Sequence, residues 1–258
     1  MLEWLGHVNH LSGRRDADHT GRSATCLSGA LVRMTAPLAA WANVTLALMG
    51  PAVVAVAATH ARPNLPVLVA NALGLAAIAL IALAVITWAI LGEGYRWRRL
   101  GLCNWSLLTP LSAIALTAFF VFVFGPLASW ALAGLGDRGF APGIETANQL
   151  PTAYLTLTIV VGAAAEELLY RGYAIERLVD LTGSYLVASA VSVIAFGLAH
   201  VPMWGLAAAA TTIASGGILT GIYIWRRDLV ALILAHIATD VSGLVIAPQL
   251  ARAATGSS

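Results

Sequence analysis

The sequence predicts an all-α protein, a polytopic transmembrane helix bundle of about seven spans. Its composition is the first reason: the 258 residues are 59% hydrophobic and only 10% charged, with a mean hydropathy of +0.84. A soluble globular domain carries about 25% charged residues. The second reason is that stretches without charged side chains recur along the chain, each long enough to cross about 30 Å of hydrocarbon. The third is that arginines collect in alternate loops.

The N-terminal half supplies three predicted spans, which together with their loops make up residues 34–149. Pro63 and Pro66 separate the first span from the second, and Pro126 predicts a kink near the end of the third. Each of the three stretches lacks Arg, Asp and Glu. They are residues 34–59, 67–91 and 107–135.

Residues 1–33 precede these spans and are polar, which predicts a cytoplasmic N-terminal tail. The segment lacks the compact apolar core of a cleaved signal peptide. His7, His10 and His19 are interpreted as part of a solvated tail and not as a metal-binding tract. Cys26 and Cys103 are far apart in unrelated contexts, which excludes a zinc ribbon or a disulfide framework.

The C-terminal half supplies four more spans within residues 150–247, and residues 248–258 form a short tail. The fourth span covers 152–178 and the seventh covers 229–246. Between them, residues 181–225 contain no Arg, Asp or Glu, a run too long for one crossing. The stretch 200–205, which contains Pro202 and Gly205, predicts the break between spans five and six.

The arginine distribution predicts the orientation of the chain. All 14 basic residues are arginines, and alternation of the spans places eleven of them on one side and three on the other. Because basic residues concentrate in cytoplasmic loops, the N-terminus is expected in the cytoplasm and the C-terminus outside. The formal net charge of +2 is too small to indicate a nucleic-acid partner.

Two adjacent acids, Glu166 and Glu167, stand where a membrane helix should carry none. An acid at the centre of such a helix costs a few kcal/mol on insertion scales, which favours a functional explanation. Neighbouring residues differ by about 100° around an α-helix, so only one acid can face a narrow cavity. Glu167 and Arg171 are spaced i, i+4 and are expected to form a supporting ion pair. Glu166 is then the working carboxylate, while a purely structural ion-pair network is the alternative.

A turn at Gly183–Ser184 is expected to bring Glu166 level with His200. The two residues lie equally far from Gly183 along the chain. In an antiparallel hairpin with a rise of 1.5 Å per residue, each side chain is about 25 Å from the turn. His236 and Asp240, again spaced i, i+4, are expected in the same layer, where Asp240 either orients the imidazole or faces the substrate.

These four groups predict a catalytic site that activates water. Glu166 is the candidate general base with His200 beside it. His236 and Asp240 are candidates to stabilise an oxyanion. Alternatively, His200, His236 and Glu166 are candidate ligands of a divalent metal ion such as Zn²⁺, whose bound water becomes acidic. Hydrolysis of a peptide bond inside the membrane is the reaction that fits.

The motifs Glu166-Glu167-x-x-x-Arg171-Gly172, Phe196-x-x-x-His200 and His236-x-x-x-Asp240 resemble the three-motif signature of the CPBP family of intramembrane proteases. That family includes the type II CAAX-prenyl protease and bacterial relatives once called abortive-infection proteins. The last position of the signature is more often Asn than Asp. The resemblance implies an endopeptidase with Glu166 as the base, either zinc-dependent or metal-free, and it covers about residues 150–247.

The expected substrate is a membrane-associated peptide or protein. An all-Arg, Ala-rich chain is typical of a GC-rich bacterial genome, so a bacterial plasma membrane is expected and a prenylated CAAX substrate is not. Three rival classes stay open. They are a catalytically silent binding or immunity protein, a proton- or cation-coupled transporter, and a haem carrier with His200 and His236 as axial ligands. No internal repeat supports the transporter, and the sequence makes no prediction about the oligomeric state.

Overall fold

A computed structural model describes residues 26–255, with side chains described for residues 38–254. Residues 1–25 of the expected polar tail, including His7, His10 and His19, lie outside the described residues, as does the side chain of Cys26. The described residues from Ala39 onward form one compact unit, and those before it, 26–38, belong to another. The larger unit contains the helices and the cavity discussed below.

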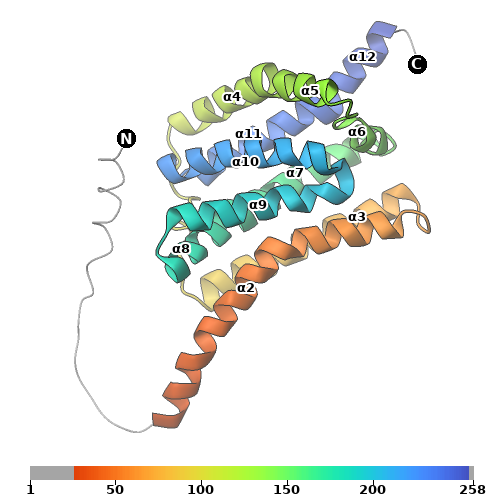
Figure 1. Ribbon diagram of the computed structural model, residues 1–258. Coiled ribbons are helices and arrows are strands. Elements are labelled where there is room, and N and C mark those ends of the chain that lie inside the picture. Colours follow the sequence, from red (N-terminus) through yellow and green to blue (C-terminus); the bar gives the residue numbers. More distant parts are fainter. Residues whose placement is uncertain (1–25, 256–258) are drawn as a thin grey trace. The chain divides into compact units, whose positions relative to one another are not determined.

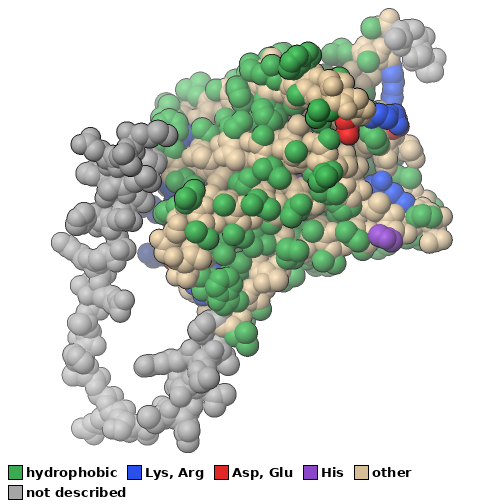
Figure 2. All heavy atoms as spheres, in the orientation of Figure 1, with side chains coloured by type: hydrophobic (Ala, Val, Ile, Leu, Met, Phe, Trp, Pro, Cys, Tyr) green, Lys and Arg blue, Asp and Glu red, His purple; other side chains and the backbone are tan. Residues whose placement is uncertain are grey.

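The described residues contain seven helices long and apolar enough to cross a membrane, and no strand. This confirms the predicted all-α, polytopic class. Figure 1 shows these helices packed side by side in the larger unit, and Figure 2 shows hydrophobic side chains spread over the visible face of that unit. Each of the seven spans has large hydrophobic side chains that are exposed, as a membrane span must.

The first three spans end close to their predicted limits. The helix α2 (Cys26–Ala61) includes the candidate span Leu38–Ala61, and α3 (Val67–Leu91) has the predicted bounds. The third span, Leu108–Gly134, is made of α4 (Leu108–Phe119), a π-helical turn η2 (Phe120–Phe124) and α5 (Gly125–Gly134). Pro126 lies in the first turn of α5, directly after the π-helical turn. Because η2 continues into α5 without a break, the missing N–H group of Pro126 removes one hydrogen bond from the helical ladder.

The fourth span, Thr152–Thr182, differs from the prediction in its backbone. After α7 (Thr152–Glu166) it continues as a nine-residue π-helix, η3 (Glu167–Ile175), and ends with α8 (Glu176–Thr182). The wider turn leaves carbonyl groups out of the α-helical hydrogen-bond ladder, and the hydroxyl of Ser192 donates to the carbonyl of Tyr170 at 2.7 Å. Such π-helical segments are frequent at functional sites. The π-helix starts at the residue after Glu166.

The predicted hinge at Gly183–Ser184 is confirmed. Gly183 adopts the left-handed conformation with φ 70° and ends α8. Ser184 caps α9 (Tyr185–Trp204) by accepting a hydrogen bond from the backbone N–H of Val187. The break between the fifth and sixth spans is also where it was expected, because Gly205, with φ 82°, separates α9 from α10 (Leu206–Arg226).

The remaining elements complete the bundle. They are α6 (Ala141–Ala147), α11 (Leu229–Val241), the π-helical turn η4 (Ser242–Ile246) and α12 (Ala247–Thr255). The helix α9 packs against α10, and α11 packs against α4 and α7. The C-terminal segment, expected as a short tail from residue 248, is helical as far as Thr255. The candidate site motifs therefore lie on α7, α9 and α11, with η3 joined to α7.

Polar contacts tie together the loops that follow α3 and α10. The hydroxyl of Tyr95 donates to Asp180 at 2.6 Å, and Arg99 also donates to Asp180. Arg227 forms a bidentate ion pair with Glu176, in which its two terminal nitrogens lie 2.5 and 2.6 Å from the carboxylate oxygens. Because Asp180 and Glu176 both belong to α8, this helix anchors both loops at one end of the bundle. Burial raises the pKa of Tyr95, and its hydrogen bond to Asp180 acts in the same direction.

Candidate active site

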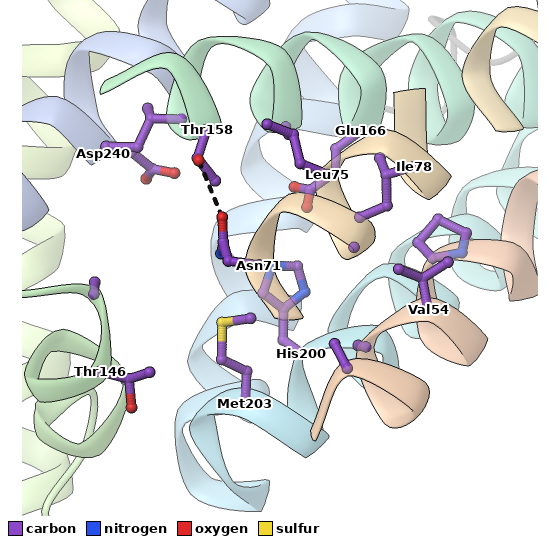
Figure 3. A pocket seen from close by; sticks show the side chains of 18 of the residues that line it. Val54, Asn71, Leu75, Ile78, Thr146, Thr158, Glu166, His200, Met203 and Asp240 are labelled. Atoms are coloured by element: carbon purple, nitrogen blue, oxygen red, sulfur yellow. Dashed lines mark hydrogen bonds between the residues drawn. The ribbon is translucent and has the colours of Figure 1, made fainter. Parts of the chain in front are cut away.

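A cavity of about 230 Å³ opens among α2, α3, α6, α7, α9 and α11. Its walls are mostly apolar and are rich in small side chains. Figure 3 shows the carboxylate of Glu166 and the imidazole of His200 pointing into this space from different helices. The polar side chains that line the cavity are those of Arg62, Asn71, Thr146, Thr158, Glu166, Tyr170, His200, Trp204, His236 and Asp240.

The two adjacent acids occupy different environments, as the helical rotation between them requires. Glu166 lines the cavity, and its side chain is 20% exposed. Glu167 lies behind the cavity wall with a fully buried side chain. Arg171, itself buried, donates to Oε1 of Glu167 at 2.9 Å. The predicted i, i+4 ion pair is therefore present, although its residues lie on a π-helix and not on a regular α-helix.

Arg171 is held in place by further contacts from α9 and α10. Its guanidinium lies 4.1 Å from the centre of the Phe196 ring, an arrangement that favours a cation–π interaction. It also lies 3.4 Å from the hydroxyl of Thr220 and from the carbonyl of Gly216. A Cβ atom at Gly216 would lie 2.9 Å from the Phe196 ring and 3.0 Å from Arg171. Only a residue without a side chain lets α10 approach the buried arginine this closely.

His236 connects the buried ion pair to the cavity. Its Nδ1 atom lies 2.9 Å from Oε1 of Glu167, the same oxygen that binds Arg171. Its Nε2 atom lies 3.9 Å from Glu166 and 3.6 Å from Asp240. The sequence left two roles open for Asp240, to orient this ring or to face the substrate. In the structure Glu167 holds Nδ1, and Asp240 lies on the side of the ring that bears Nε2.

His200 is oriented by its own helix. Its Nδ1 atom lies 2.7 Å from the carbonyl oxygen of Phe196, one turn earlier. A carbonyl can only accept, so Nδ1 carries the proton and donates it, leaving Nε2 as the remaining polar atom of the ring. The ring also packs edge-on against Phe196, with 4.7 Å between the ring centres.

The structure thus brings Glu166, His200, His236 and Asp240 to one cavity from three helices. Within the described residues, the imidazole in ion-pair range of Glu166 is that of His236. His200 faces the same space without such a contact. The predicted levelling of Glu166 with His200 across the hinge therefore holds at the scale of the cavity, whereas direct pairing of the two does not.

The two histidines are suited to bind a metal ion, but the spacing of the possible ligands is not. A histidine whose Nδ1 donates to a carboxylate or carbonyl presents Nε2 as a ligand, as metal-bound histidines do. His200 and His236 both have this arrangement. In residues 38–254, however, no three His, Cys, Asp or Glu side chains are grouped closely enough to hold one ion. The residues present therefore do not form a metal site as they are arranged.

Two lining residues, Asn71 and Arg62, were not among the predicted site residues. Asn71 lies on α3, and its Oδ1 atom accepts a hydrogen bond from Thr158 on α7 at 3.2 Å, as Figure 3 shows. An amide within an otherwise apolar span was a readable signal in the sequence. Arg62 lies in the loop before α3 and is one of the three arginines that the sequence places on the outer side.

Comparison with known proteins agrees with the motifs. Residues 148–242 match the family model described as Rce1-like, type II CAAX prenyl endopeptidase Rce1-like. No curated protein and no solved structure matches the chain. The matched segment contains the acid pair, His200, His236 and Asp240, and it confirms the resemblance to intramembrane CAAX-type proteases. Residues 148–242 of this membrane protein thus form a domain of the Rce1-like type II CAAX prenyl endopeptidase family.

Proposed function

We propose that the protein is an intramembrane endopeptidase that hydrolyses a peptide bond of a membrane-associated peptide or protein. The observation that carries this proposal is the convergence of Glu166, His200, His236 and Asp240 on one mostly apolar cavity. Four ionisable groups gathered inside a membrane-spanning bundle are costly and need a function. The protease family of residues 148–242 supplies the reaction class.

Glu166 acts as the general base in this proposal. It lines the cavity, and Arg171 does not neutralise it, because Arg171 binds the neighbouring Glu167. Glu166 takes a proton from water as the water oxygen forms a bond to the carbonyl carbon of the substrate. When the C–N bond breaks, the same proton passes to the leaving nitrogen. Water and an amide thereby become a carboxylic acid and an amine, with no external reactant.

His236 stabilises the negative charge that develops on the carbonyl oxygen, while Nε2 of His200, which carries no proton in this tautomer, accepts a hydrogen bond from the attacking water. Both rings are held at Nδ1, by a backbone carbonyl and by Glu167, which leaves Nε2 as the atom available to the substrate. A donor that is oriented before the reaction stabilises an oxyanion without reorganisation. His236 donates from Nε2 in its doubly protonated form, since Nδ1 already donates to Glu167, and Asp240 lies 3.6 Å from Nε2.

The substrate and the setting follow from composition and orientation. A small membrane-associated peptide or protein of a bacterial cell is the proposed substrate, in a plasma membrane with the N-terminus cytoplasmic and the C-terminus outside. The excess of arginine on one side of the spans supports this orientation.

The test compares cells that produce the wild type with cells that produce Glu166→Gln, by mass spectrometry of membrane peptides. Cleavage products present with the wild type and absent with Glu166→Gln are expected, while both proteins reach the membrane in equal amounts. Glu145→Gln is the matched control, because Glu145 is an exposed acid on α6, paired with Arg138. Identical products from the wild type and Glu166→Gln would reject the assignment and favour a catalytically silent binding protein.

A further inference from the structure

Arg62 is a charged residue of the cavity to which the proposed reaction gives no task. In the described part of the chain it is the arginine that lines the cavity, in the loop between α2 and α3, and it is partly buried. The described ion pairs do not include it. A guanidinium at the edge of an apolar cavity is suited to bind a carboxylate through bidentate hydrogen bonds.

The register between α2 and the fourth span locates Arg62 relative to Glu166. The hydroxyl of Tyr170 donates to the carbonyl of Leu48 at 3.3 Å, which sets these two residues level. Glu166 lies one turn before Tyr170, and Arg62 lies almost four turns after Leu48, in the same direction along the bundle. At 1.5 Å per residue, Arg62 is about 15 Å from Glu166 along the bundle axis.

Asn71 provides a second donor near the same end. Its Oδ1 atom is occupied by Thr158, while its NH₂ group has no hydrogen-bond partner among the described residues. Thr158 lies about 12 Å before Glu166 along α7, so Asn71 is near the level of Arg62. The amide and the guanidinium both donate, and neither accepts at these nitrogen atoms. This end of the cavity therefore favours a ligand with a hydrogen-bond acceptor, preferably a negatively charged one.

The wall between the two ends leaves room for an extended chain. On α2, Ala55 and Ala58 line the cavity, and on α7, Gly162 does so one turn before Glu166. A Cβ atom at Gly162 would meet nothing within 4 Å. An extended peptide advances about 3.3 Å per residue, so 12–15 Å corresponds to about four residues.

We propose that Arg62 and Asn71 form a carboxylate-binding subsite that selects peptides with an acidic group about four residues from the bond hydrolysed at Glu166. This proposal rests on the proposed function and names its substrate class: an apolar peptide segment with one anionic group. Arg62 is a specificity-determining residue in this arrangement and takes no part in proton transfer.

The experiment measures binding in the Glu166→Gln background, where no peptide is consumed. The probes are dansyl-labelled heptapeptides of Ala, Val and Leu that end in a carboxylate or in a carboxamide. A third probe is a carboxamide peptide with an internal Asp, which distinguishes a side-chain acid from the chain terminus. We expect the matching acidic peptide to bind about tenfold to a hundredfold more tightly than the neutral one, as charge-assisted hydrogen bonds give.

Arg62→Gln should bring this ratio to about one, and Arg62→Lys should retain part of it. Arg98→Gln is the matched control, because Arg98 is an exposed arginine that does not line the cavity. A ratio that Arg62→Gln leaves unchanged overturns the proposal. Equal weakening of acidic and neutral peptides also overturns it, since Arg62 would then only anchor the helix ends at lipid headgroups.

Hydrolysis assays separate this proposal from the proposed function. Cleavage that depends on Glu166 but shows no preference for acidic peptides would support the proposed protease function and reject the carboxylate-binding subsite. The opposite result is binding that prefers acidic peptides and depends on Arg62, while the wild type cleaves no peptide tested. That result would support the subsite and reject the proposed hydrolysis. The two proposals therefore fail by different observations.

Discussion

His236 and Arg171 bind the same oxygen of Glu167, each at 2.9 Å. The second acid of the pair therefore joins the buried cation to an imidazole of the cavity. Its Oε2 atom is buried and has no hydrogen-bond partner among the described residues. Both groups that stabilise this carboxylate, His236 and Arg171, therefore contact the same oxygen atom. Changes at Glu167 are thus expected to affect both the stability of the bundle and the orientation of His236.

Glu167→Gln should lower the free energy of unfolding by about 3 kcal/mol, because it leaves the Arg171 guanidinium buried without its counter-charge. Thermal unfolding in detergent micelles measures the effect. The matched control is Glu145→Gln, which breaks an exposed ion pair with Arg138 and should cost less than 1 kcal/mol. Equal midpoints for Glu167→Gln and the wild type would contradict a supporting role for the ion pair.

Metal dependence is the second prediction. Because no three donor side chains are grouped to hold one ion in the described residues, we expect activity to persist in 1,10-phenanthroline. We expect purified protein to contain less than one equivalent of zinc by elemental analysis. One equivalent of zinc that is lost in both Glu166→Gln and His236→Ala would contradict this and establish a metal site. Arg98→Gln, remote from the cavity, controls for nonspecific loss.

The pH dependence of stability is the third prediction. Burial raises the pKa of Tyr95 above its ordinary value near 10, and the hydrogen bond to Asp180 adds to the rise. The unfolded state therefore loses this proton first, so the stability from Tyr95 is complete below about pH 10 and falls as the pH rises further. Tyr95→Phe should lower stability by about 1 kcal/mol at pH 8 and should reduce the decline between about pH 10 and 11.

Denaturation midpoints at several pH values measure this effect. Tyr185→Phe, the same substitution at the start of α9, controls for titration elsewhere in the protein. An identical decline in the wild type and in Tyr95→Phe would show that the Tyr95 proton does not contribute.

Local signals made much of the fold predictable. A left-handed Gly183 followed by the capping residue Ser184 is a signature that neighbouring residues alone determine, and the hinge was located correctly. The bounds of α3 follow from Pro66 and from a charge-free run. The π-helix after Glu166 had no such signal, because it depends on contacts from other helices, such as the Ser192 hydroxyl on the Tyr170 carbonyl.

The motifs in the sequence named four ionisable residues that line the cavity, but they did not give the contacts between them. Spacing indicated the Glu167–Arg171 pair because both residues belong to one helix. The bond from His236 to Glu167 joins residues 69 positions apart, and its formation depends on how α11 is rotated against η3. The face of α3 that lines the cavity was missed for a related reason, although the amide of Asn71 was visible in the sequence. The helix α3 is apolar around its whole circumference, so periodicity does not show which face lines a cavity.

The fourth prediction concerns Gly162, which lines the cavity one turn before Glu166 and has open space where a Cβ atom would stand. Gly162→Ala should be stable, with a gain of up to about 1 kcal/mol from helix propensity, and should retain activity. Gly162→Leu should fold as well but extend its side chain into the cavity beside Glu166, which excludes the substrate and abolishes cleavage. Activity assays with melting curves measure both effects.

Gly143 provides the contrast, because it lines the same cavity but has no free space. A Cβ atom there would lie 2.0 Å from the Trp204 ring, so Gly143→Ala should disturb the packing of α6 on α9 and lower stability. If Gly162→Leu remained fully active, the space beside Glu166 would not be the one that the substrate enters. If it unfolded the protein, Gly162→Ser would repeat the test with a smaller side chain and should reduce cleavage only partly.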